Sequence, residues 1–221
     1  MRQADNIRAV EALGVDWMGF IFWPRSSRYV SERPAYLPTR CRRVGVFVDA
    51  TADEVLARVA DFGLNAVQLH GHESPAYLAT LRTESTAMLR TLRTESTALL
   101  RAGASVPDGS PSGLTLIKAL SVATPADLAP AADYEGLADY LLFDTKGERA
   151  GGNGRQFDWS VLDHYHGTTP FLLSGGIGPD DGQRLAAFHH PQCVGIDLNS
   201  RFELAPALKD IEKLKTFITA L

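Results

Sequence analysis

The sequence predicts an α/β protein in which buried strands alternate with helices along one domain of 221 residues. Short apolar runs bounded by turn residues are typical of buried parallel strands, and such runs recur through the chain. Segments with helical spacing of apolar residues lie between them. Two of the runs end at Asp144 and at the Ser-Gly-Gly of residues 174–176. Functional groups of such folds collect at the carboxyl ends of the strands.

The chain is expected to begin with a helix over residues 1–13, because Ala4, Ile7 and Val10 recur at helical spacing and Gly14 is a natural stop. Residues 17–22 (WMGFIF) then read as a strand. A short helix is expected over residues 31–40, although Pro34 and Pro38 interrupt it.

The next part of the chain repeats the strand-then-helix pattern. Residues 43–48 (RVGVFV) and 66–70 (AVQLH) are predicted strands, and residues 51–62 are the helix between them. A further helix is expected to begin near Ser74 and Pro75, since proline is favoured in a first helical turn.

That helix contains a tandem repeat. Residues 80–90 (TLRTESTAMLR) are followed by residues 91–101 (TLRTESTALLR), which differ only in having Leu99 where the first copy has Met88. An 11-residue unit spans about three helical turns, so a second copy can extend one helix without rotating its apolar stripe. We predict a duplication over residues 80–101 within a peripheral helix. A looped-out second copy is the alternative, because Ser and Thr weaken helix propensity.

The second half of the chain continues the alternation after a loop over residues 102–113. The expected elements are a strand at 116–120, a helix at 125–134, a strand at 140–143, a helix at 158–165, a strand at 170–173, a helix at 179–188, a strand at 193–198 and a terminal helix at 208–221.

Composition narrows the class of protein. The chain is 45% hydrophobic and 22% charged, as is usual for a soluble globular protein, and its net charge of -4 argues against nucleic acid or an acidic membrane as partner. No signal peptide or membrane-spanning run is recognisable, so we expect a cytoplasmic protein. Cys41 and Cys193 are too few for a disulfide framework, and no metal-ligand spacing occurs. We expect neither a metal nor a cofactor.

Seven strand-and-helix units of this length favour a (β/α)8 TIM barrel over residues 1–221, with seven strands encoded. Because the chain opens on a helix that should follow a strand, the first strand, β1 of such a barrel, is the one that is lacking. An open doubly wound sheet is the alternative. It is disfavoured because no strand is followed by the G-x-G-x-x-G fingerprint of a dinucleotide site.

The strand-exit segments resemble one known family along nearly the whole chain. They read GFIFWPRSSRYV, RVGVFVD, NAVQLHGHE, LIKAL, LLFDTKGERAGGNGRQFDW, LLSGGIGPDD and IDLNSRFE. In order and spacing they resemble phosphoribosylanthranilate isomerase of tryptophan biosynthesis. The resemblance implies an Amadori rearrangement, in which an aminoaldose phosphate attached to anthranilate opens its ring and becomes an aminoketose.

The resemblance also implies roles for individual residues. Such chemistry needs a general acid at the ring oxygen and a base at C2′. Asp144 matches the family's acid, with a helix cap or a partner for Lys146 as the alternative. The family's base is a cysteine in a first strand that reads K-[IV]-C-G-[MI], which is absent from this chain. His70 could lie in the site and orient a neighbour, and its use as a substitute base is a less favoured alternative.

Other positions match substrate-binding residues of the family. Arg28 matches an arginine that holds the anthranilate carboxylate, a task suited to a planar bidentate donor. Asp197 resembles an acidic residue near the sugar hydroxyls. The expected phosphate-binding residues share glycine-rich or small polar loops after the last strands, and they are Gly152, Asn153, Gly175, Gly176, Asn199 and Ser200. Lys118 lies within a strand, and the sequence does not say which way it points.

Three functions compete on this evidence. The first is the isomerase, impaired by the absent cysteine strand; the second is a noncatalytic barrel that binds a phosphorylated sugar. A relative of indole-glycerol-phosphate synthase is disfavoured, because the paired lysine and glutamate motifs of that family are not seen. A missing barrel strand would leave the strands near residues 17 and 193 with unpaired edges, so we also expect possible self-association through them.

Overall fold

The computed structural model describes residues 1–101, 113–147 and 156–221 of the chain. Its centre is a seven-stranded sheet in which every neighbouring pair is parallel and the spatial order follows the sequence order. The strands are β1 (Trp17–Ile21), β2 (Arg42–Phe47), β3 (Ala66–Leu69), β4 (Thr115–Val122), β5 (Tyr140–Thr145), β6 (Phe171–Leu173) and β7 (Cys193–Ile196). All seven coincide with strands expected from the sequence.

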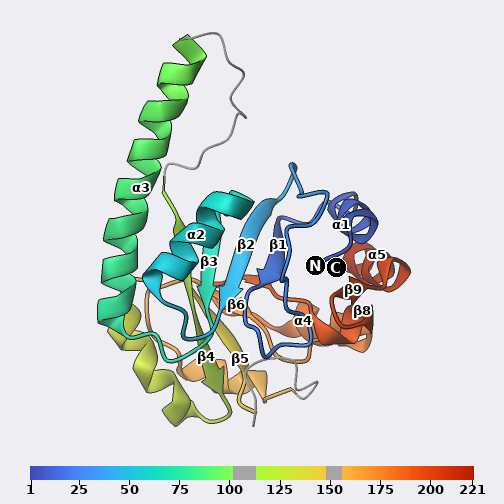
Figure 1. Ribbon diagram of the computed structural model, residues 1–221. Coiled ribbons are helices and arrows are strands. Elements are labelled where there is room, and N and C mark those ends of the chain that lie inside the picture. Colours follow the sequence, from blue (N-terminus) through green and yellow to red (C-terminus); the bar gives the residue numbers. More distant parts are fainter. Residues whose placement is uncertain (102–112, 148–155) are drawn as a thin grey trace.

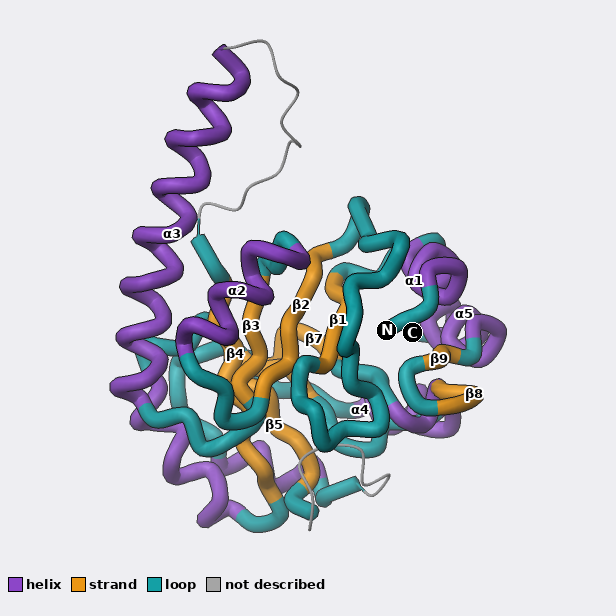
Figure 2. Tube along the Cα trace, viewed as in Figure 1, coloured by secondary structure: helices purple, strands orange, loops and turns teal. Residues whose placement is uncertain are grey.

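The helices lie outside this sheet, as Figure 2 shows. The α-helices are α1 (Ala4–Glu11), α2 (Ala52–Phe62), α3 (Pro75–Arg101), α4 (Gly182–Ala187) and α5 (Ile211–Ala220). The 3₁₀-helices are η1 (Pro125–Tyr134), η2 (Trp159–His164), η3 (Pro179–Asp181) and η4 (Ser200–Phe202). Helices and a curled parallel sheet together make a mixed α/β fold with the form of a half-barrel. Within the described ranges, no helix has both the length and the apolar character needed to cross a membrane.

Local sequence explains where the helices begin and end. In α2 the hydroxyl of Thr51 accepts from the amide of Glu54, and the Glu54 carboxylate accepts from the amide of Thr51. This capping box satisfies amides that a helix start leaves free. Gly63 ends the helix at φ 56°, a left-handed conformation that glycine adopts without a steric cost.

Side chains alternate between the two faces of the sheet along each strand, and this produces two apolar layers. The larger core lies between the convex face of the sheet and the helices, and it includes Phe47, Leu69 and Phe143. The concave face carries a smaller cluster that includes Val44, Ile117 and Leu142. Because side chains alternate between the two faces, residues two apart along one strand line the same layer. The same alternation decides which face of the sheet the polar side chains at the strand ends point to.

The sheet is curled but open. Among the described residues, β1 and β7 stand at the two ends of the strand order and pair with no further strand on their outer edges. The backbone nitrogen of Met1 donates to the carbonyl oxygen of Gly19 in β1 at 2.9 Å, so the chain immediately before α1 lies along this edge.

Helix α3 contains both copies of the repeat, and Figure 1 shows it projecting past the rest of the molecule. The first copy packs on the core through Leu81, which is fully buried, while Met88 and Leu89 are partly buried against the same core. Thr91 and Thr94 of the second copy are exposed.

The helix expected over residues 31–40 is wrong. In the structure this segment is irregular, since Pro34 and Pro38 lack the N–H groups that a helix requires. The segment is held by Glu11 of α1 instead, whose carboxylate accepts from the amides of Thr39 at 2.6 Å and Arg40 at 2.5 Å.

The chain also differs from expectation near its C-terminal end. Residues 203–209 form a small antiparallel pair, β8 (Glu203–Ala205) with β9 (Leu208–Lys209), where no strand was expected and the terminal helix was expected to begin at residue 208. Helix α5 begins only after Asp210, whose carboxylate accepts from the amide of Lys213 at 3.0 Å. The aspartate N-cap therefore sets the helix start.

Deleting residues 91–101 should change the free energy of unfolding by no more than about 1 kcal/mol, because the deletion shortens a projecting helix without removing the buried first copy. Urea unfolding followed by circular dichroism measures this. Leu81→Ala is the matched comparison, with an expected loss of about 2–5 kcal/mol. A deletion that costs as much as Leu81→Ala would show that the second copy is part of the core.

Candidate active site

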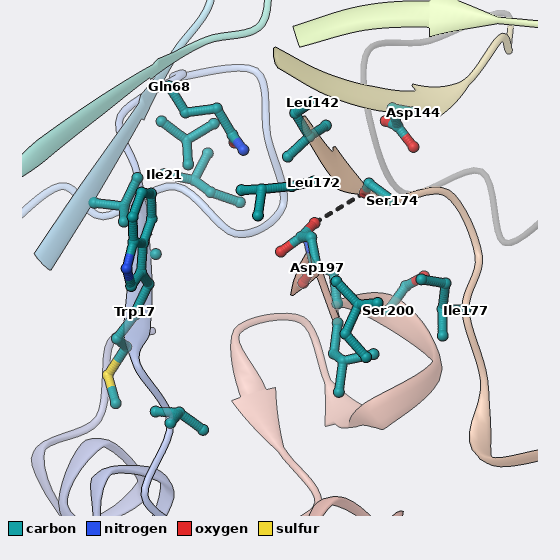
Figure 3. Close-up of a pocket in the computed structure, with 18 of the residues that line it drawn as sticks. Trp17, Ile21, Gln68, Leu142, Asp144, Leu172, Ser174, Ile177, Asp197 and Ser200 are labelled. Atoms are coloured by element: carbon teal, nitrogen blue, oxygen red, sulfur yellow. Dashed lines mark hydrogen bonds between the residues drawn. The ribbon is translucent and has the colours of Figure 1, made fainter. Parts of the chain in front are cut away.

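A cavity of about 670 Å³ opens between the edges of β1 and β7 and extends along the concave face of the sheet. Its apolar wall includes Trp17, Ile21, Leu142 and Leu172. Figure 3 shows these side chains together with the polar residues of the strand ends, Asp144, Ser174 and Asp197. A largely apolar hollow with a few converging polar groups is typical of a small-molecule site.

Asp144 lies at the carboxyl end of β5, on the wall of this cavity. Its side chain is 11% exposed, and its Oδ2 lies 3.2 Å from Nε2 of His70, which follows β3. The amide of Thr145 donates to Oδ1 at 2.8 Å. On the other side of the imidazole, Nδ1 lies 3.4 Å from Oε1 of Gln68. The structure therefore brings together two residues that sequence analysis had assigned separately, and it adds Gln68.

Asp197 follows β7 and faces Ser174, which follows β6. The hydroxyl of Ser174 donates to Oδ2 of Asp197 at 2.9 Å, the interaction drawn in Figure 3. Burial in the wall of the cavity raises the pKa of Asp197, and the Ser174 hydrogen bond opposes that shift only in part. Asp197 is therefore a carboxyl group with a strengthened hold on its proton.

The expected phosphate-binding residues lie partly within the described structure. Gly175, Gly176, Asn199 and Ser200 all line the cavity. Gly152 and Asn153 lie outside the described residues. Four of the six expected residues therefore lie at one cavity, in the loops after β6 and β7.

Backbone conformation explains the glycines after β6. Gly175 has φ 92° and Gly176 has φ 68°, which glycine adopts readily. A Cβ on Gly175 would lie 2.7 Å from the backbone nitrogen of Thr145, so any side chain there would displace the end of β5. No described residue accepts a hydrogen bond from the amide of either glycine. These amides are donors suited to an anion.

Arg28 is held by a carboxylate that sequence analysis missed. Its Nε donates to Oε1 of Glu203 at 3.0 Å and its Nη2 to Oε2 at 2.6 Å. Lys209 lies 3.5 Å from Glu203 and donates to the side-chain oxygen of Asn199 at 2.9 Å. Burial opposes the ionisation of Glu203, but Arg28 and Lys209 together lower its pKa. Glu203 thus links the predicted carboxylate site to the predicted phosphate loop.

The sequence contains only a weak indication that Glu203 and Lys209 belong to the site. Each is a single charged residue in a polar segment, where a solvated side chain is the usual outcome. Both are partly buried here because β8 and β9 fold back beside Arg28.

The two cysteines lie away from this polar group of residues. Burial raises the pKa of the Cys41 thiol to about 11 and also raises that of Cys193. Both thiols are therefore protonated near neutral pH and are poor bases. Within the described ranges, no cluster of three or more His, Cys, Asp or Glu side chains could hold a metal ion.

The fold and the site together define a class: an α/β half-barrel that places two carboxyl groups, an imidazole and an arginine around a small-molecule cavity at the strand ends. The model of the N-(5′-phosphoribosyl)anthranilate isomerase family matches residues 1–108 and 108–220. The chain belongs to this family.

Named relatives agree with the family model. An N-(5′-phosphoribosyl)anthranilate isomerase of Phocaeicola vulgatus is 45% identical over 221 residues, which span 100% of this chain and 94% of that protein. The crystal structure of phosphoribosyl anthranilate isomerase from Thermotoga maritima has a TM-score of 0.73 and 27% identity, covering 100% of this chain and 94% of the other.

A further solved structure contains a ligand. It is a phosphoribosyl anthranilate isomerase in complex with reduced 1-(o-carboxyphenylamino)-1-deoxyribulose 5-phosphate, with a TM-score of 0.69 and 25% identity, covering 100% of this chain and 97% of that one. That ligand has a carboxylate, a sugar chain and a phosphate.

The raised pKa of Asp197 has a consequence for stability. The folded protein keeps this proton to a higher pH than the unfolded chain, so the free energy of unfolding should fall as the pH rises from about 3.9 through the raised value. Asp197→Asn should remove this part of the fall.

Urea unfolding at several pH values between about 4 and about 8 tests this expectation. Asp133→Asn, which changes an exposed carboxylate, is the control and should keep the original pH dependence. An unchanged slope in Asp197→Asn would mean that Asp197 titrates normally.

Proposed function

We propose that this chain is a cytoplasmic enzyme of tryptophan biosynthesis that converts N-(5-phosphoribosyl)anthranilate into 1-(2-carboxyphenylamino)-1-deoxyribulose 5-phosphate. The observation that carries the proposal is the convergence of Asp144, His70, Arg28 and Asp197 on one cavity, in a chain that matches the isomerase family along its whole length. The substrate would present a carboxylate, a ring and a phosphate to groups suited to each.

Asp144 is proposed as the general acid. Protonation of the furanose ring oxygen breaks its bond to C1′, and the nitrogen lone pair forms a Schiff base. Removal of the C2′ proton by a base then yields an enolamine, which tautomerises to the aminoketose. His70, 3.2 Å from Asp144, orients the carboxyl group and contacts the substrate from the same wall.

Arg28 is proposed to hold the anthranilate carboxylate while Glu203 holds Arg28. Glu203 occupies the guanidinium edge formed by Nε and Nη2. Among the described residues, Nη1 has no hydrogen-bond acceptor. A guanidinium has five N–H groups, so the free edge can still pair with a second carboxylate.

The phosphate is proposed to bind the backbone amides of Gly175 and Gly176 together with Asn199, Ser200, Gly152 and Asn153. The support within the described residues is the location of four of these at one cavity and the lack of acceptors for the two glycine amides. Asp197 is proposed to contact the sugar hydroxyls, beside Ser174.

The space between β1 and β7 is proposed to accept one more parallel strand, which would complete a (β/α)8 barrel in a single domain. Among the described residues neither edge pairs with a further strand of the sheet, although Ile21 forms an isolated bridge with Tyr29 and Met1 donates to Gly19 at the β1 edge. The cavity runs between the two edges. The strand would carry the cysteine base that the family resemblance implies. Without it, the two edges would be free to pair with a second copy of the chain.

The alternative function is phosphosugar binding without catalysis. It is favoured by one observation: partial burial raises the pKa of both described thiols, Cys41 and Cys193, so neither offers a ready base near neutral pH. Turnover measurements and ligand-binding measurements on the same protein separate the two functions.

Asp144→Asn should reduce kcat by about 10²- to 10⁴-fold, because an amide cannot protonate the ring oxygen. The measurement is the fluorescence change as substrate is consumed. It is made in whichever form of the protein is active, the chain as given or the strand-extended form described below. Binding of the reduced product analogue should change little. Asp180→Asn, an exposed carboxylate, is the control and should keep full activity. Full activity in Asp144→Asn would remove Asp144 from the mechanism.

Extending the chain before Met1 by a strand segment that includes Lys-Val-Cys-Gly should raise turnover by about 10³-fold, since it supplies a base and its positioning. The matched control carries Lys-Val-Ser-Gly, which fills the same space without a thiol.

Both extensions should raise the melting temperature and reduce self-association in sedimentation experiments. Only the cysteine form should gain turnover. Wild-type-like turnover by the unextended chain would contradict the need for this strand. Analogue binding without turnover in either extended form would favour the noncatalytic function.

A further inference from the structure

A buried ion pair lies on the convex face of the sheet, against the main chain on both sides of His70. Lys118 is in β4 between Ile117 and Ala119, whose side chains belong to the concave cluster. Because side chains alternate along a strand, Lys118 points to the convex face, away from the cavity. There it pairs with Glu73 at 2.9 Å, and the two side chains are 2% and 1% exposed.

Lys118 uses its ammonium group on three acceptors. Nζ donates to the carbonyl oxygen of Leu69 at 3.1 Å, to that of Gly71 at 2.7 Å and to Oε2 of Glu73 at 2.9 Å. An ammonium has three N–H groups, so this set matches its capacity. Two of the three acceptors are the carbonyls immediately before and immediately after His70.

Glu73 completes the arrangement from the other side. Its carboxylate accepts from the amide of Gly71 at 3.0 Å and from the amide of Asp49 at 2.9 Å. The exits of β2 and β3 are thus tied to one carboxylate. A Cβ on Gly71 would lie 2.6 Å from the backbone nitrogen of Asp49, so glycine is required where the two exits meet.

The pair therefore holds the main chain on both sides of His70 from behind the sheet. The imidazole itself points the opposite way, toward Asp144. We propose that Lys118 and Glu73 are positioning residues, which fix the backbone around His70 so that its ring stays within hydrogen-bond reach of Asp144. The proposal rests on the proposed role of Asp144 only where it concerns turnover.

The pair is better suited to holding the main chain in place than to increasing the free energy of unfolding. A buried ion pair must offset the loss of hydration of two charges, and apolar replacements are often equally stable. Its hydrogen bonds, in contrast, have fixed geometry and join the exits of β2 and β3 to the interior of β4. A displacement of about 1 Å in a catalytic group can cost about 10²-fold in rate. Holding the main chain around His70 in place would therefore protect the rate.

The test measures how strongly the chemical shifts of the His70 imidazole nitrogens respond to the substitution Asp144→Asn, a response called here the His70 coupling. The imidazole nitrogen signals of His70 are recorded by NMR in the unaltered chain and in Asp144→Asn. Their difference reports the contact between the two side chains. The same difference is then measured in the double variant Lys118→Met with Glu73→Gln, which removes both charges.

The matched control is a second ion pair at the opposite ends of the strands. Arg82 donates to the carbonyl oxygens of Leu114 and Leu137, each at 2.9 Å, and to Asp139 at 2.8 Å. It is also a cation held by two carbonyls and one carboxylate. Arg82→Met with Asp139→Asn should leave the His70 coupling intact.

The proposal predicts that the coupling falls at least about twofold in the Lys118 and Glu73 variant, and that kcat of the strand-extended form falls about tenfold with KM within about threefold. An undiminished coupling would overturn it, as would an equal loss in the Arg82 control.

If the double variant does not fold, Glu73→Gln alone provides the same test, because it removes one charge and retains the side-chain shape. Because the NMR measurement needs no turnover, a failure of the proposed function would not be mistaken for a failure of this proposal.

Discussion

All seven strands of the sheet run in the same direction, and the geometry of the site depends on this constraint. Parallel strands bring their carboxyl ends to one rim, so residues distant in sequence meet there. His70 follows β3 and Asp144 ends β5, yet their side chains lie 3.2 Å apart. Ser174 and Asp197 meet in the same way after β6 and β7. Alternation along each strand then directs these side chains into the concave face, where the cavity lies.

The sheet is not closed, so each of its two end strands has one edge that pairs with no further strand of the sheet among the described residues. A closed barrel has no edge, whereas this sheet ends at β1 and β7 among the described residues. The cavity between them is lined by apolar side chains, including Trp17 and Leu172. An extended segment could satisfy both backbone edges and cover these side chains at once. The cavity and the two outer edges of the sheet therefore lie at the same place in the described structure.

Charged groups near the rim form two paired sets, one partly buried and one fully buried. Arg28, Glu203 and Lys209 form one set, which faces the cavity, and Lys118 with Glu73 forms the other, behind the sheet. In each set a carboxylate receives donors from separate parts of the chain. Buried charges are tolerated only when they are paired and hydrogen-bonded. Removing one member of either set would leave its partner with an unpaired, poorly hydrated charge, which is energetically costly.

Sequence analysis located most of the fold. Every strand of the parallel sheet was predicted, because a short apolar run between turn residues reports burial directly. The helix over residues 31–40 was wrong because its two prolines outweigh a weak helical pattern. The pair of β8 and β9 was not foreseen, since two short strands acquire their meaning only from contact with each other.

Within the site, the sequence by itself determined which residues end the strands, including Asp144, His70 and the glycines at 175 and 176, because strand ends are readable from local pattern. Their roles remain proposals. Only the tertiary structure decided which side chains face one another: that His70 contacts Asp144, that Glu203 holds Arg28, and that Lys118 points away from the cavity to Glu73. Hydrogen bonds between distant residues depend on the curvature of the sheet and on strand register, and neither is written in any local stretch of sequence.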